Sequence, residues 1–136
     1  MSPIRLAAML ALVGITFSNT AIPAPLVAQS APQRIEIVLD NFSFAPSDIQ
    51  LAAGKPVTLA MVNRGSGGHN FIAKDFFAAA SMDTATRAKL GKKGVVELAK
   101  GEAMDVTLTP KAGSYKVKCG HFMHSTFGMT GTITVS

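Results

Sequence analysis

A short segment near the C-terminus gathers side chains that could bind a soft metal ion. It contains the only cysteine of the chain, Cys119, two of its three histidines, His121 and His124, and Met129. The remaining histidine, His69, lies far upstream. Two imidazoles, one thiolate and one thioether form the ligand set of a blue-copper site, with two His and one Cys in a plane and a weak axial Met. The residue types therefore predict one copper site.

The sulfur donors favour copper over other metal ions. Thiolate and thioether ligands are soft, whereas Mg²⁺ and Ca²⁺ take oxygen ligands, and structural zinc sites use four comparable ligands in a tetrahedron. Cys119 also has no cysteine partner for a disulfide within the chain. An unpaired thiol is a liability in an oxidising compartment, and binding as a metal thiolate removes that liability.

The spacing of these residues suits a loop between two strands. In Cys119-x4-His124-x4-Met129 the chain can leave one strand, turn to present an imidazole, and turn again to present a sulfur. His121 also follows Cys119 closely, so either His121 or His124 could supply the second imidazole. His69 must then come from the end of a different strand.

The elements that must position these residues are mostly strands. Residues 34–40 alternate apolar and charged side chains, which is typical of a half-buried strand. Strands are expected at residues 34–40, 49–51, 57–62, 71–72, 95–98, 103–108, 114–119 and 131–135. An Ala-rich helical insertion is expected near residues 74–90, with Asp83 as N-cap of a second helix and Gly91 as its stop. Short strands separated by turns predict an all-β sandwich or barrel.

The N-terminus has the features of an export signal. Arg5 precedes an apolar run at residues 6–17, and a zone of small residues follows. The run is shorter than the roughly 18 to 20 residues that a membrane-spanning helix needs. We therefore expect a secretory signal peptide at residues 1–30, a mature domain at residues 31–136, a periplasmic location, and no stable membrane anchor after cleavage.

The charge balance argues against nucleic acid as a partner. The chain has 13 Lys and Arg against 8 Asp and Glu, and removal of Arg5 with the leader leaves 12 against 8, a net charge of +4. That excess is too modest for a nucleic-acid-binding domain. A local group of lysines forms either a solvated face or a docking patch for an acidic partner: Lys89, Lys92, Lys93 and Lys100.

The chain resembles the cupredoxin family, the copper proteins that include plastocyanin and azurin. The resemblance covers roughly residues 34–136 and is carried by four segments: Phe44-Ala-Pro46, Gly54-Lys-Pro56-Val57, Gly68-His69-Asn70-Phe71 and Cys119 to Val135. It implies a cupredoxin-like Greek-key β-sandwich or barrel with a short helical insertion.

The same resemblance implies a role for each site residue. It implies one type 1 copper site with these ligands: His69, Cys119, His124 and, axially, Met129. Asn70 would join the two ligand loops by hydrogen bonds and so fix the orientation of the ligands. The spacing Cys-x4-His-x4-Met recurs among type 1 sites and favours His124 over His121. His121 is then a loop histidine, a copper-transfer residue or an electron exit.

The other methionines and the phenylalanines of the loop are expected to pack in the core or around the site. Met61 and Met104 lie in strand patterns and are expected in the core. Met123 either packs within the loop or offers a transient contact to Cu(I). Phe122 and Phe127 are expected to shield the metal from water.

Two functions fit this site, and both require copper. The first is a one-electron carrier between redox partner proteins. The alternative is a copper chaperone or buffer that delivers copper to an acceptor protein, and the additional soft ligands His121 and Met123 favour it. An enzyme is not expected, because a thiol nucleophile would leave Met129 without a role. A trinuclear copper oxidase would need histidines beside the cysteine, where this chain has Lys118 and Gly120.

Overall fold

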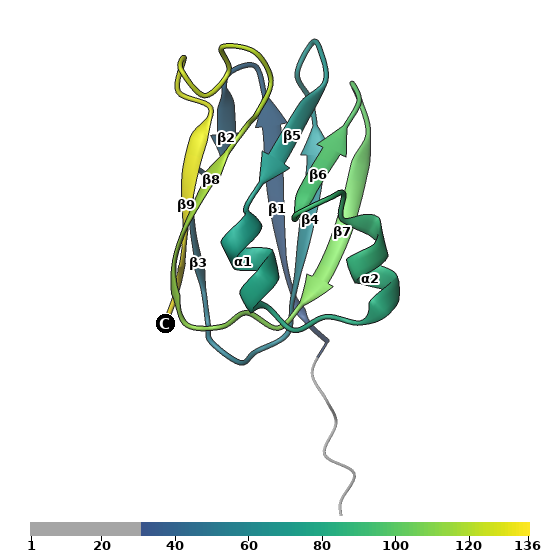
Figure 1. Ribbon diagram of the computed structural model, residues 1–136, viewed down its shortest axis with the longest axis vertical. Helices are drawn as coiled ribbons and strands as arrows, with labels where there is room; N and C mark the ends of the chain where they lie inside the picture. Colours follow the sequence, from purple (N-terminus) through teal and green to yellow (C-terminus); the bar gives the residue numbers. More distant parts are fainter. Residues whose placement is uncertain (1–30) are drawn as a thin grey trace, which may run out of the picture.

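In the computed structural model, which describes residues 31–136, strands form two packed sheets with two short helices beside them (Figure 1). The strands are β1 Gln33–Asp40, β2 Ser43–Ala45, β3 Asp48–Leu51, β4 Val57–Asn63, β5 His69–Ile72, β6 Val95–Leu98, β7 Ala103–Leu108, β8 Gly113–Lys118 and β9 Thr130–Val135. The helices are α1 Lys74–Ala79 and α2 Thr84–Lys89. The predicted all-β sandwich with a helical insertion is confirmed.

Each sheet mixes parallel and antiparallel pairs. One sheet has the order β2-β1-β4-β7, and the other has the order β3-β9-β8-β5-β6. β1 runs parallel to β4 and β3 runs parallel to β9, whereas the remaining neighbours are antiparallel. The ligand-bearing segments His69 and Cys119 therefore belong to one sheet, at β5 and at the end of β8.

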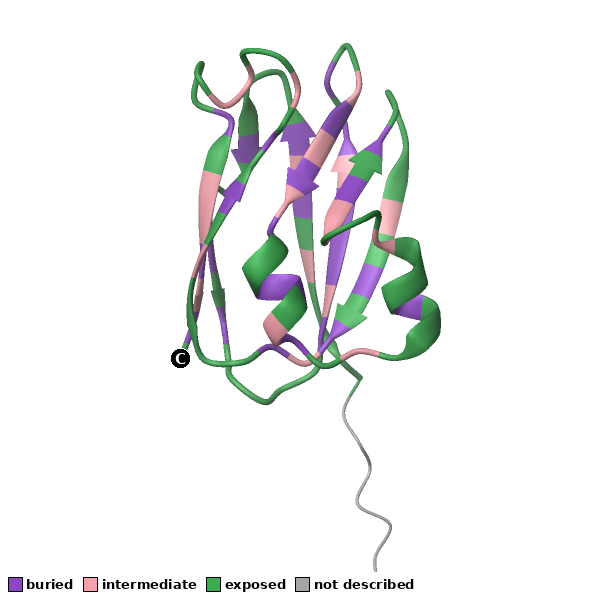
Figure 2. Cartoon of the chain, in the orientation of Figure 1, coloured by how far each residue is buried: buried purple, intermediate pink, exposed green. Residues whose placement is uncertain are grey.

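The core lies between the sheets, and buried residues alternate with more exposed ones along several strands (Figure 2). In β1 the apolar residues Ile37 and Leu39 are fully buried, and in β4 Leu59 and Met61 are fully buried. Met61 is thus a core residue as predicted. Met104 is half-buried and packs against the same core. Burial of such apolar surface is the main favourable term in folding.

The helical insertion is anchored by a cap and by one arginine. Asp83 is the N-cap of α2, as predicted, and its carboxylate accepts a hydrogen bond from the Thr86 N–H at 2.6 Å. Arg87 donates hydrogen bonds to the carbonyl oxygens of Phe77 at 3.4 Å and Ala80 at 3.1 Å. The arginine therefore ties α2 to the end of α1.

Helix α1 completes the sandwich where β5 ends. The strand β5 is short, and in Figure 1 α1 follows it directly along the same track. Phe76 and Phe77 of α1 are buried, and their rings meet Tyr115 and Phe71 edge-on at 5.4 Å and 6.3 Å between centroids. The insertion thus fills part of the core, away from the end of the sandwich that carries the loop after β8.

The structure adds one strand that the sequence pattern did not indicate. Residues Ser43–Ala45 form β2, which pairs with β1 in antiparallel register. The turn between these strands contains Phe42, whose φ is 59°.

The predicted signal peptide at residues 1–30 lies outside the described residues. Within residues 31–136, no helix combines the length and apolar character required to cross a membrane.

Candidate metal centre

The candidate ligands meet at the end of the sandwich opposite the chain terminus marked C in Figure 1. His69 is the first residue of β5, directly after the loop that leaves β4. Cys119 follows the last residue of β8, and the loop that it opens leads through His124 to Met129, just before β9. β5 and β8 pair in antiparallel register at Ile72 and Lys118, so the start of β5 and the end of β8 face the same end of the sandwich.

The alternation of β5 buries His69. His69 and Phe71 point into the sandwich and Asn70 points outward, so the imidazole is only 2% exposed. Gly65 lies against the ring, and a Cβ at that position would overlap the Nε2 atom. Within the described part of the chain, this Nε2 is buried without a hydrogen-bond partner. The other nitrogen, Nδ1, faces the candidate site.

Three donor groups converge on one point. The Nδ1 atoms of His69 and His124 lie 3.2 Å apart, and the His124 Nδ1 lies 3.4 Å from the Cys119 Sγ. One ligand atom from each of the three residues lies within 4.8 Å of the others. These separations suit donors arranged around one ion with bonds of about 2.0 Å to nitrogen and 2.3 Å to sulfur.

The electrostatics favour the form of His69 that binds a metal. Burial lowers the pKa of His69 below the ordinary 6.5 of an imidazole, because the charged form loses its hydration. The neighbouring imidazoles of His124 and His121 lower this pKa further. His69 is therefore neutral at pH 7, with a lone pair available for coordination.

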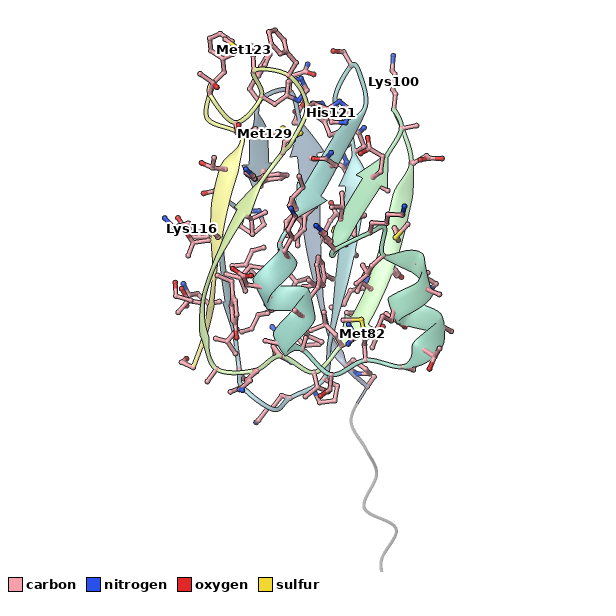
Figure 3. All side chains as sticks on the ribbon, viewed as in Figure 1. Met82, Lys100, Lys116, His121, Met123 and Met129 are labelled. Carbon is pink, nitrogen blue, oxygen red and sulfur yellow. The ribbon has the colours of Figure 1, made fainter. Side chains whose placement is uncertain are left out.

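Met129 closes the loop and is completely buried. Its backbone carbonyl accepts a hydrogen bond from the Cys119 N–H at 3.0 Å, and its N–H donates to the His124 carbonyl at 2.9 Å. Figure 3 labels Met129 at the same end of the sandwich as His121. The main chain of this methionine thus joins the cysteine and the histidine of the loop.

Asn70 joins the two ligand-bearing segments. Its side-chain Oδ1 accepts a hydrogen bond from the Gly120 N–H at 2.6 Å. Asn70 follows His69 and Gly120 follows Cys119, so this single contact links the residues next to two candidate ligands.

His121 stands beside the three-donor cluster and is not a member of it. Its ring stacks on that of His124, with centroids 5.5 Å apart and planes inclined by 21°. Its Nε2 lies 2.7 Å from the Oε1 of Glu97 on β6. The geometry therefore groups His124, rather than His121, with His69 and Cys119.

Phe42 is the phenylalanine side chain that packs directly on the His124 ring, and the expected Phe127 packs on Phe42 instead. The ring of Phe42 meets the His124 ring edge-on at 5.1 Å, and Phe127 meets Phe42 at 5.6 Å. The prediction that Phe122 shields the site is wrong, because its side chain is 90% exposed and points into solvent. Phe42 was missed because it belongs to the turn between β1 and β2, and only the folded chain brings it to the loop.

The donor chemistry fits a copper ion. Two imidazole nitrogens, a cysteine sulfur and a thioether are the ligands that type 1 sites combine, and this chain has buried Cys119 and Met129 beside its histidines. His69, Cys119 and His124 place one possible ligand atom each within 4.8 Å of the others, so these three residues could hold one metal ion. Met129 lies at the same end of the sandwich (Figure 3).

Comparison with solved structures finds the same fold in copper proteins. Auracyanin B is 29% identical, with 81% of this chain and 94% of that chain covered and a TM-score of 0.57. Auracyanin A from Chloroflexus aurantiacus, described as a "blue" copper protein, is 25% identical, with 78% and 100% covered and a TM-score of 0.54. A dithionite-reduced auracyanin from Roseiflexus castenholzii is 20% identical, with 79% and 99% covered and a TM-score of 0.57, which shows the shared fold.

Comparison with curated proteins gives no match. The family model described as a cupredoxin-like domain matches residues 6–135, nearly the whole chain. With the two-sheet sandwich and the His-Cys-His cluster at its end, this match shows that the chain belongs to the cupredoxin-like domain family.

Proposed function

We propose that the protein is a one-electron carrier with a single type 1 copper site. His69, Cys119 and His124 would be the strong ligands and Met129 the axial ligand. The observation that carries this proposal is the convergence of two imidazole nitrogens and one cysteine sulfur, with separations of 3.2 Å and 3.4 Å around His124 Nδ1. The similarity to auracyanin A, described as a blue copper protein, supports it.

The chain supplies a rigid frame for these donors. Hydrogen bonds from the Cys119 N–H to the Met129 carbonyl and from the Met129 N–H to the His124 carbonyl lock the loop. The Asn70–Gly120 contact ties that loop to β5. Bound copper would alternate between Cu(II) and Cu(I), and donors that stay in place make this exchange fast, since little rearrangement accompanies it.

A partner could approach the site through an apolar patch, which we define as Phe42, Phe122, Met123 and Phe127. All four side chains are exposed, and Phe42 contacts the ring of His124. Exposed apolar groups that gather in one place mark interaction sites. Small interfaces of this kind suit the brief encounters of redox proteins.

The experiment that tests the proposal is a Cu(II) titration of the mature protein, followed by visible absorption, EPR and cyclic voltammetry. We expect a strong thiolate-to-copper absorption band at one equivalent and a reversible one-electron wave. A Cys119→Ser variant serves as control and should lack the band. A colourless adduct, or copper that is lost on reduction, would contradict the electron-carrier function.

A second candidate function is copper delivery to an acceptor protein. The observation that favours it is the pair of additional soft or borderline donors on the loop, since His121 stacks on His124 and Met123 is exposed. Transfer to an excess of a Cu(I) chelator separates the two functions. A carrier keeps its copper through repeated redox cycles, whereas a delivery protein gives up Cu(I) quickly, and His121→Ala would slow that release.

We also propose that the mature domain, residues 31–136, acts in the periplasm after export. The apolar run at residues 6–17 supports this proposal. Expression of the full chain in a Gram-negative host, fractionation and N-terminal sequencing test it. A processed N-terminus near residue 31 in the periplasmic fraction is expected, and an unprocessed cytoplasmic protein would refute it.

A further inference from the structure

Glu97 faces Asn70 across two neighbouring strands. The two residues are register partners in the antiparallel pair of β5 and β6. Both side chains point to the outer face, because the residues that flank them in their strands are buried. Partners directly opposite each other in an antiparallel pair have Cβ atoms about 5 Å apart and interact readily. Here the Nδ2 of Asn70 donates a hydrogen bond to the Oε2 of Glu97 at 3.0 Å.

The two ends of the Asn70 amide have opposite hydrogen-bonding character. The oxygen end accepts from the Gly120 N–H at 2.6 Å, and the nitrogen end donates to Glu97. If the amide turned over, its NH₂ would face the Gly120 N–H and its oxygen would face the carboxylate. Both contacts would then be repulsive. Glu97 therefore reinforces the one orientation of Asn70 in which its oxygen can accept from the Gly120 N–H.

The second oxygen of the same carboxylate reaches the loop directly. The Oε1 of Glu97 lies 2.7 Å from the Nε2 of His121, whose ring stacks on that of His124. In Figure 3 His121 lies at the site end of the sandwich, beside the upper ends of β5 and β6. One carboxylate on β6 thus has contacts to both segments that border the donor cluster.

We propose that Glu97 is a positioning residue of the metal centre. It fixes the amide of Asn70, and this amide holds the backbone at Gly120 and so the start of the loop at Cys119. The proposal deepens the copper function proposed above and rests on it for its effect on the metal. The hydrogen-bond relay from Glu97 through Asn70 to Gly120 is a property of the metal-free chain.

The expected effect is local rather than global. The Glu97 side chain is 57% exposed, and exposed pairs contribute little to overall stability because water screens them. Glu36 offers a matched control, since its side chain is 58% exposed and contacts Arg64 at 3.1 Å. It lies on β1, in the other sheet. Removing either carboxylate changes the net charge equally, but only Glu97 contacts Asn70.

The first test is amide hydrogen exchange at Gly120 in the metal-free protein, measured by NMR. We expect Glu97→Ala to speed this exchange roughly fivefold, which corresponds to about 1 kcal/mol for one lost hydrogen bond. Glu97→Gln should restore the native rate, because its amide oxygen still accepts from Asn70. Glu36→Ala should leave the rate unchanged, and Glu97→Ala should add nothing in an Asn70→Ala background.

Two results would overturn the proposal. One is native exchange at Gly120 in Glu97→Ala. The other is equal acceleration by Glu97→Ala and Glu97→Gln, which would assign the effect to charge rather than to the orientation of Asn70.

The second test uses the copper-loaded protein. Glu97→Ala should release copper to a chelator roughly tenfold faster than the native protein does. Glu97→Gln and Glu36→Ala should release copper at the native rate. The two proposals fail in different ways. If the native protein gives no thiolate-to-copper band, the copper function fails while the exchange result at Gly120 stands. If the native protein binds copper and Glu97→Ala behaves like Glu36→Ala, the positioning role fails alone.

Discussion

The imidazoles of His69 and His124 point their Nδ1 atoms at each other across 3.2 Å, although 55 positions separate them in the sequence. One comes from the start of β5 and the other from the loop that joins β8 to β9. Two basic nitrogens at this distance need a shared proton or a shared metal ion, because their lone pairs repel. The thiol sulfur of Cys119, 3.4 Å from His124 Nδ1, makes a soft metal ion the better candidate.

The two loop histidines should respond differently to substitution. His124→Ala removes a donor that lies with His69 and Cys119, so we expect loss of the thiolate-to-copper band and copper affinity at least about tenfold lower. His121→Ala removes a ring that stacks outside the cluster, so this variant should keep both the absorption band and the copper affinity. Copper titration with visible absorption measures this difference. The reverse pattern would assign the second imidazole to His121.

Gly65 should be required for the position of His69. A Cβ added at Gly65 would overlap the imidazole Nε2, whereas a Cβ at Gly67 would meet open space. We therefore expect Gly65→Ala to displace the ring and to alter the Cu(II) EPR spectrum. Gly67→Ala, in the same loop, should leave the spectrum native. Identical spectra for the two variants would show that the loop absorbs the added methyl group without moving His69.

Met129 should tune the reduction potential without deciding whether copper binds. Met129→Leu keeps the buried apolar volume but removes the thioether that we propose as the weak axial donor. Cu(II) depends on that donor more than Cu(I) does, so we expect a higher potential with the absorption band retained. Met123→Leu changes an exposed methionine of the same loop and should leave the potential unaltered. Cyclic voltammetry of both variants decides between an axial role and a packing role for Met129.

Phe122 should contribute to contact with another protein molecule rather than shield the copper from water. Its ring is 90% exposed, so Phe122→Ser leaves the copper environment intact and should not change the visible spectrum. Electron self-exchange between Cu(I) and Cu(II) forms requires two molecules to meet at their site ends, and we expect it to slow roughly tenfold, the effect of about 1.4 kcal/mol. NMR line broadening in mixtures of the two forms measures this rate. An unchanged rate would place the docking surface elsewhere.

The sequence predicted the elements of this fold better than the contacts at its site end. Strands β6 and β7 have the predicted bounds, because turn residues such as Gly94 and Gly101 flank their apolar segments. Strand β2 was not predicted, since three residues are too few to show a period. The contact of Phe42 with His124 and the contact of Glu97 with Asn70 depend on tertiary packing and on strand register. No local sequence pattern indicates either of these two contacts.

The N-cap of α2 should make the stability of the helical insertion depend on pH. This dependence can be measured without copper. The Asp83 carboxylate accepts hydrogen bonds from the Thr86 N–H and the Thr86 hydroxyl, and these lower its pKa below the ordinary 3.8. Because the pKa is lower in the folded state, the cap stabilises fully above the unfolded pKa, and its contribution is lost as the pH falls through the folded value. Asp83→Ala should therefore lower the melting temperature by a few degrees at pH 7, with a much smaller difference near pH 2. Asp48→Ala, on the exposed side of β3, controls for the loss of one carboxylate. A deficit in Asp83→Ala that stays constant from pH 7 to pH 2 would assign the effect to helix propensity rather than to the charged cap.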